Sequence, residues 1–170
     1  MHWTDKAGIL RIGKEEDMTM EEKQQELNPK AQKFQAFLEE NNIKAFAVES
    51  AADEFKSAVF RSRMEVNGQE LPTAVVIDNS IYVMVRVQIV SGAIQEKTRA
   101  AVLDCINQLN GQYKVFKYYI TEKGDLYLDA CLPCLEESFS GELVRTLINV
   151  MLQHLTEQYP TLMRSVWAEE

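Results

Sequence analysis

Two cysteines separated by two residues, Cys131 and Cys134, are the pair whose spacing best fits a chemical motif. A CxxC pair placed just before a helix can have a lowered thiol pKa and support redox chemistry. The sequence has no second such pair, no nearby histidine to complete a zinc site, and no preceding βαβ pattern of the thioredoxin type. We therefore expect no cofactor and no metal, and redox use of this pair remains an alternative.

The other candidates for catalysis are isolated in the sequence. His154 lies in a helical pattern without a serine or carboxylate partner at a matching spacing, and His2 lies near the chain start. Adjacent acidic residues such as Glu136 and Glu137 do not share a helix face. The sequence also has neither a phosphate loop nor a dinucleotide fingerprint. It predicts a protein that is not an enzyme.

Bulk composition narrows the possible partners. The 170-residue chain has a formal net charge of −8 and is 46% hydrophobic, as one ordinary globular domain would be. An acidic chain is a poor match for nucleic acid or anionic lipid, because both are bound through lysine and arginine. The sequence shows no spanning apolar run, no signal peptide and an odd number of cysteines. We expect a cytoplasmic protein that binds neither nucleic acid nor membrane.

The stretch of residues 71–90 holds the densest β-branched content of the chain. Its second half alternates strictly, and the aliphatic positions are Ile81, Val83, Val85, Val87 and Ile89. Such alternation predicts a strand with one face on the core and one mixed face. If helices cover one face of the sheet only, Tyr82, Met84 and Arg86 point outward, and Tyr119 of a later strand is a further contact candidate. The alternative is that this stripe belongs to the core.

Turn signals divide the rest of the sheet. Asn67 and Gly68 predict a type I′ hairpin turn, which joins a strand over residues 53–66 to the stretch just described. Pro72 lacks an amide donor and predicts an edge or bulged position in the second strand. Residues 45–50 are a short strand candidate. Two later strands are predicted over residues 114–121 and 126–131.

Three helices are predicted around these strands. Asn28 followed by Pro29 is a favourable start for the first helix. The second carries one apolar face and ends at an Asn110-Gly111 C-cap. The third begins near residues 136–138 and runs to Tyr159, where Pro160 predicts a kink although helical spacing continues beyond it.

These elements predict an α+β fold in the order helix, three strands, helix, two strands, helix. The sheet is expected to be five-stranded and mostly antiparallel, with helices packed on one face. Residues 1–28 are expected to form a polar N-terminal arm and residues 29–170 a single domain. The element order, length and acidity resemble the type III secretion chaperone-like fold, which is shared by acidic homodimeric secretion chaperones and by the YbjN family of bacterial proteins.

The resemblance implies a non-enzymatic homodimer that binds a protein or peptide partner. A YbjN-like regulatory or protein-binding module is the preferred interpretation, and a secretion-type chaperone that holds a partner polypeptide is the alternative. A small-molecule sensor with a pocket between sheet and helices is a further alternative. The sequence identifies neither the partner nor the dimer surface.

Overall fold

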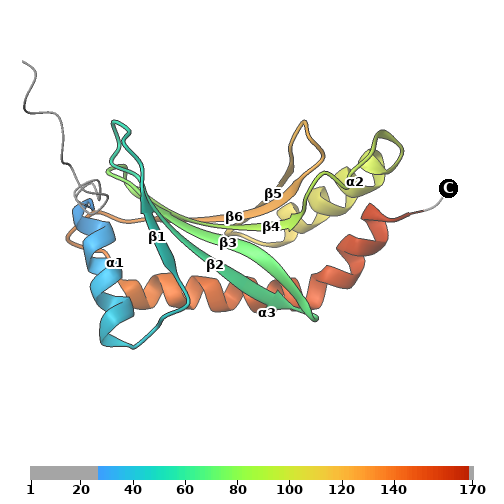
Figure 1. Cartoon of the computed structure of the whole chain (residues 1–170). Coiled ribbons are helices and arrows are strands. Elements are labelled where there is room, and N and C mark those ends of the chain that lie inside the picture. Colours follow the sequence, from blue (N-terminus) through green and yellow to red (C-terminus); the bar gives the residue numbers. More distant parts are fainter. Residues whose placement is uncertain (1–26, 169–170) are drawn as a thin grey trace, which may run out of the picture.

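A six-stranded antiparallel sheet with three helices on one face forms the fold, which a computed structural model describes for residues 27–168 (Figure 1). The predicted α+β class is confirmed, with one strand more than the five expected. Apart from its last two residues, the predicted N-terminal arm lies outside the described residues. In chain order the elements are α1 (Pro29–Glu40), β1 (Ala47–Ser50), β2 (Ala58–Val66), β3 (Gln69–Ile77), β4 (Tyr82–Val90), α2 (Glu96–Gln112), β5 (Phe116–Ile120), β6 (Leu126–Pro133) and α3 (Gly141–Val166).

The sheet order is β1-β2-β3-β4-β6-β5, and every neighbouring pair is antiparallel. The additional strand is β1, which the sequence marked only as a short candidate. It pairs with the first four residues of β2, from Ala58 to Arg61, and no further. Strand β2 starts later than residue 53 because the chain turns before it, with Lys56 in the left-handed region.

The predicted turn between β2 and β3 is confirmed. Asn67 and Gly68 both have positive φ, at 49° and 79°, as a type I′ turn requires. Pro72 lies inside β3, opposite Arg63 of β2, rather than at the start of the strand. The pairing of β3 with β4 stops at Thr73, so the missing donor of Pro72 interrupts no ladder.

The core lies between the helices and one face of the sheet. The aliphatic stripe of β4 is buried from Val83 to Ile89, whereas Ile81 precedes the strand and is half exposed. Helix α3 runs along this face, with α1 beside its start and α2 beside its end (Figure 1). Helix α3 contributes a stripe of buried side chains to the core, formed by Val144, Leu147, Met151 and Leu155.

Asn28 fixes the first helix to the sheet. Its side chain accepts a hydrogen bond from the Ala31 amide at 3.0 Å, which makes it the predicted N-cap of α1. Its Nδ2 also donates to the carbonyls of Lys56 and Ile77, both at 2.9 Å. Asn28 is buried and therefore joins the start of α1 to Lys56, just before β2, and to Ile77, the last residue of β3.

Three predicted helix ends are wrong. Helix α2 continues through Gly111 to Gln112, because Asn110 is not a C-cap and its side chain binds the backbone of β5 instead. Helix α3 starts at Gly141, capped by the side chain of Ser140, and continues through Pro160. Leu162 and Val166 beyond the proline are buried, and this burial offsets the cost of continuing the helix.

Candidate functional site

One face of the sheet, here called the open face, carries none of the described helices and presents the polar stripe predicted on β4. Tyr82, Met84 and Arg86 alternate with the buried valines of that strand, and Tyr82 is half exposed. Tyr119 of β5 lies on the same face, since it alternates with the buried Tyr118. The four predicted contact residues therefore share one side of the sheet, and the stripe is not part of the core.

An ion pair lies at the centre of the open face. Arg86 faces Asp129 of β6 in the antiparallel register, and the guanidinium binds the carboxylate with two hydrogen bonds of 2.9 and 2.8 Å. The side chain of Asp129 is only 1% exposed, whereas that of Arg86 is 39% exposed. The carboxylate is thus covered and held by the arginine, whose outer edge remains accessible.

Aromatic side chains surround this pair. The rings of Tyr119 and Tyr127 stack with centroids 5.6 Å apart and planes 19° apart. The guanidinium carbon of Arg86 lies 5.8 and 5.4 Å from these two centroids, within cation–π range. Gln88 donates to the Tyr127 hydroxyl at 3.1 Å, and the Lys117 ammonium lies 5.3 Å from the Tyr119 ring. Arg86 is therefore held between the Asp129 carboxylate and two stacked rings, with Lys117 as a second cation beside them.

The electrostatics of this cluster favour binding over proton transfer. The hydrogen bonds to Asp129 raise the pKa of Arg86 above its ordinary value. Burial, followed by the nearby Asp129 charge, raises the pKa of Tyr119. Arg86 therefore stays charged and Tyr119 stays protonated at neutral pH, so neither supplies a general base.

A shallow trough of about 430 Å³ lies beside the cluster, over β3. Small residues of β3 form its floor, because Pro72 and Ala74 are flanked by longer side chains on both neighbouring strands. Its lining, here called the arginine trough, is Arg61, Ser62, Arg63, Pro72, Thr73, Ala74, Arg86, Gln88 and Tyr127. The lining contains three arginines and no acidic residue, on a chain whose net charge is −8.

Sequence reasoning missed half of this site. Tyr127 and Asp129 alternate with buried residues of β6, and that period-two signal places them on the open face. Which strand lies beside β6 was the missing information. The pairing of β6 with β4, rather than with β5 alone, brings Asp129 to Arg86 across 43 residues of sequence.

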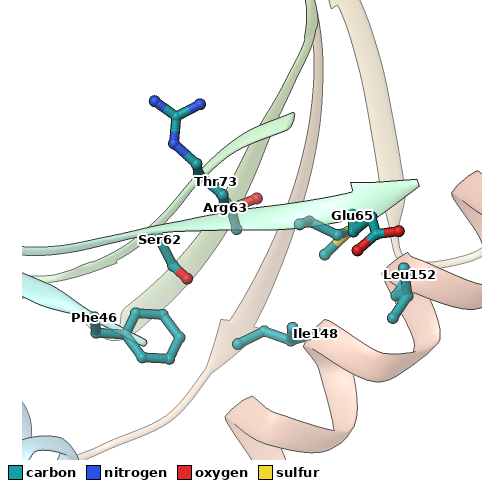
Figure 2. A pocket seen from close by; sticks show the side chains of 8 residues that line it. Phe46, Ser62, Arg63, Glu65, Thr73, Ile148 and Leu152 are labelled. Carbon is teal, nitrogen blue, oxygen red and sulfur yellow. The ribbon is translucent and has the colours of Figure 1, made fainter. Parts of the chain in front are cut away.

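A second, smaller hollow lies on the helix side at the edge of the sheet, between β2 and α3. Its volume is about 200 Å³, and its lining is Phe46, Ser62, Arg63, Met64, Glu65, Thr73, Ile148 and Leu152. Figure 2 shows Ser62 pointing from β2 toward α3, whereas Arg63 points to the opposite side of the strand. This space, here called the edge hollow, lies beyond the first residue of β1, Ala47, which pairs with Arg61.

The two predicted redox cysteines occupy an unfavourable place for redox chemistry. Cys131 lies within β6, and Cys134 precedes α3 by several residues, so neither is at the helix start. Burial, followed by the Asp129 charge, raises the pKa of the Cys131 thiol. A raised pKa reduces the thiolate fraction at neutral pH, which is the opposite of what a CxxC nucleophile needs.

His154 is buried in an aromatic box. Its Nε2 lies 2.7 Å from the Tyr118 hydroxyl, and the rings of Tyr113 and Phe116 lie at centroid distances of 4.2 and 4.4 Å. Among the described residues its Nδ1 has no hydrogen-bonding partner. The histidine is 4% exposed, so it is a packing residue rather than a site open to substrate.

No group of three or more His, Cys, Asp or Glu side chains within residues 27–168 is arranged to hold a metal ion. None of the described helices combines the length and apolar character that crossing a membrane requires.

Comparison with known proteins assigns no family. A scan against protein-family models finds no match to the chain, and a search of curated proteins finds no significant similarity. The fold is therefore described as an α+β protein with an open antiparallel sheet, and its function is inferred from the site itself.

Proposed function

We propose that the protein is a non-enzymatic protein-binding module that works as a homodimer and holds a segment of a partner polypeptide on its open face. The observation that carries the proposal is the arginine trough beside the Arg86–Asp129 pair. A face lined by arginine and tyrosine has the composition of protein-binding hot spots. An uncovered face of an antiparallel sheet can also take a partner without rearrangement of the core.

The chemistry of the trough favours an acidic segment. Arg61 and Arg63 each contact one exposed glutamate, at 2.8 and 3.7 Å, and these contacts are solvent-exposed and weak. A partner carboxylate can therefore compete for either arginine. Arg86, fixed by Asp129, offers its outer edge and its stacked tyrosines to a planar or acidic side chain.

The resemblance to YbjN-like proteins and secretion chaperones, which rests on element order, length and acidity, is consistent with this role. A regulatory or protein-binding module of the YbjN type is the form we prefer. A dedicated secretion-type chaperone is the alternative form of the same activity, because it also holds a partner polypeptide. The size of the edge hollow argues against a sensor with a pocket between sheet and helices, since about 200 Å³ is below the ~300–1,000 Å³ typical of small-molecule sites.

Selection of a displayed library of random twelve-residue peptides tests the proposal. We expect the wild-type protein to enrich peptides with several acidic residues. The Ala74→Trp variant fills the floor of the trough without touching the core, because Ala74 is on the open face. Binding of the enriched peptides to this variant should fall by about tenfold or more.

Leu103→Trp is the matched control, since Leu103 is an exposed residue on α2 and lies outside the trough. This variant should bind the enriched peptides as the wild type does. Equal binding by the Ala74→Trp variant, or failure to enrich any peptide, would contradict binding in the trough.

A further inference from the structure

Within residues 27–168, the outer edge of β2 is unpaired beyond β1. Strand β1 pairs with Ala58 to Arg61, and β2 then continues to Val66 with no other described strand on that side. Figure 1 shows the connection from α1 entering β1 beside this part of β2, which runs on past it, and Figure 2 shows β2 above α3. Five residues of β2, from position 62 to 66, therefore form a free edge next to the edge hollow.

The hairpin register determines which backbone groups point outward from this edge. In a two-residue type I′ hairpin the flanking pair, here Val66 and Gln69, exchanges hydrogen bonds, and bonding alternates along the strand from there. Arg63 and Glu65 consequently direct their N–H and C=O groups away from β3. Within residues 27–168 these four groups have no hydrogen-bonding partner. Such an edge is a template for another strand.

In a single copy, Glu65 on the free edge has a like charge as its cross-strand neighbour. Glu65 lies directly opposite Glu70 on the open face, and like charges in that position destabilise a sheet. Arg63 is the nearest basic residue of β2, and its guanidinium is 3.7 Å from Glu70. Both side chains of this contact are about two-thirds exposed, at 66% and 69%. A second cation beside Glu65 would offset the repulsion between Glu65 and Glu70.

We propose that the free edge of β2 is the homodimer surface, where the same edge of a second copy pairs antiparallel about a two-fold axis at Met64. In this register Arg63 of each copy lies opposite Glu65 of the other. The four outward backbone groups of one copy then meet the four of the other, and two Arg63–Glu65 ion pairs form on the open face. An isologous interface requires a self-complementary surface of this kind.

The edge hollow gives the dimer a buried contact on the helix side. Met64 alternates with Arg63 and Glu65 and therefore points to the face that holds α3. At the two-fold axis, Met64 of the second copy lies beside the apolar wall formed by Phe46, Ile148 and Leu152. Filling that space with an apolar side chain adds hydrophobic burial to the backbone pairing.

Charge exchange between the two positions tests the proposal. Arg63→Glu places two glutamates opposite each other at both symmetry-related contacts, and Glu65→Arg does the same with two arginines. Each variant should raise the dimer dissociation constant by about tenfold or more, measured by sedimentation or light scattering across a dilution series. An equimolar mixture of the two variants should form a heterodimer, because each copy then supplies the charge that the other lacks.

The double exchange Arg63→Glu/Glu65→Arg should dimerise as the wild type does. Lys97→Glu changes the net charge by the same amount as Arg63→Glu, at an exposed residue on α2 rather than β2, and it should leave the dimer intact. Circular dichroism spectra matching the wild type show that each variant is folded. Amide exchange should be slow at Arg63 and Glu65 in the dimer and faster in the single variants.

The inference rests on the proposed homodimer, and the outcomes separate the two. A wild-type chain that is monomeric at every concentration overturns both. A dimer that survives Arg63→Glu and Glu65→Arg unchanged overturns the edge as its surface and leaves the homodimer standing. A monomer whose Arg63 and Glu65 amides are protected until residues 1–26 are removed would assign the edge to the chain's own N-terminal segment instead. Peptide binding in the arginine trough is measured separately, at Ala74.

Discussion

Asn67, in the β2–β3 turn, donates a hydrogen bond from Nδ2 to the carbonyl of Thr156 in α3 at 3.2 Å. Thr156 lies four residues before Pro160, so its carbonyl is the one that a proline at position 160 leaves without a helical donor. The turn residue therefore replaces the missing backbone donor. One asparagine both adopts the left-handed turn conformation and ties the hairpin to the helix at its proline.

A double-mutant cycle tests this bridge. Asn67→Gly keeps the positive φ of the turn but removes the donor, and we expect a coupling of about 0.5–1 kcal/mol with Pro160→Ala. In the alanine background the helix supplies its own N–H, so the loss of Asn67 should cost less. Urea unfolding of the four proteins measures the coupling. Equal costs in both backgrounds would show that the bond does not compensate for the proline.

The same pair of residues shows how far sequence reasoning reaches. The Asn67-Gly68 turn and the Asn28 cap are local signals, and both are predicted correctly. Helical spacing beyond Pro160 is visible in the sequence, but the donor that replaces the proline N–H is Asn67, 89 residues away from Thr156, and no local pattern could show that bond. The pairing of Arg86 with Asp129 is missed for the same reason, since it depends on strand order.

Removing Arg86 should destabilise the protein more than removing a surface arginine. Arg86→Met leaves the covered carboxylate of Asp129 without its partner, and we expect a loss of about 2 kcal/mol, moderated by the partial exposure of Arg86. Arg61→Met is the control, because both members of its ion pair are more than half exposed, and it should change stability by less than about 1 kcal/mol. Urea midpoints compare the two variants.

The double variant Arg86→Met/Asp129→Leu provides a second check. It replaces both charges by apolar groups and should recover much of the stability lost in the single variant. If Arg86→Met and Arg61→Met lower the stability by the same small amount, the Asp129 carboxylate is stabilised by water rather than by the Arg86 guanidinium.

Burial of His154 should make the protein less stable in mild acid. Desolvation lowers the pKa of His154 below its ordinary value of 6.5 in the folded state. The unfolded chain therefore binds a proton more readily, and the unfolding free energy should fall as pH decreases from about 6.5 through the lower folded-state pKa. Urea unfolding at pH 7.5 and at decreasing pH values measures this slope.

His154 faces the Tyr118 hydroxyl, the rings of Tyr113 and Phe116, and the charge of Glu157 on its own helix. Of these, only the Glu157 charge opposes the lowering of the histidine pKa. His154→Gln should be less stable than the wild type at pH 7.5, because the box is repacked, but with a shallower dependence on pH in this range. An unchanged slope in His154→Gln would assign the acid sensitivity to other groups.

Cys131 should react slowly with alkylating reagents at neutral pH. With Cys105→Ser and Cys134→Ser, Cys131 is the single cysteine of the chain, and its iodoacetamide rate as a function of pH reports the thiol pKa directly. We expect a midpoint above the ordinary thiol value, and a lower one when Asp129→Asn removes the nearby charge. A midpoint below the ordinary value would instead support the redox alternative.

The opposite edge of the sheet is blocked at the middle of β5 by a side chain. Asn110 of α2 binds both outward backbone groups of Tyr118, accepting from its N–H at 2.8 Å and donating to its carbonyl at 3.1 Å. An asparagine that mimics a neighbouring strand is a device against edge-to-edge association.

Asn110→Ala should lower the free energy of unfolding by about 1–2 kcal/mol and speed amide exchange at Tyr118. The newly exposed part of the β5 edge should also promote aggregation. Asn149→Ala, at an exposed position of α3, is the control and should change none of these. Slow exchange at Tyr118 in the Asn110→Ala variant would mean that another group protects this edge.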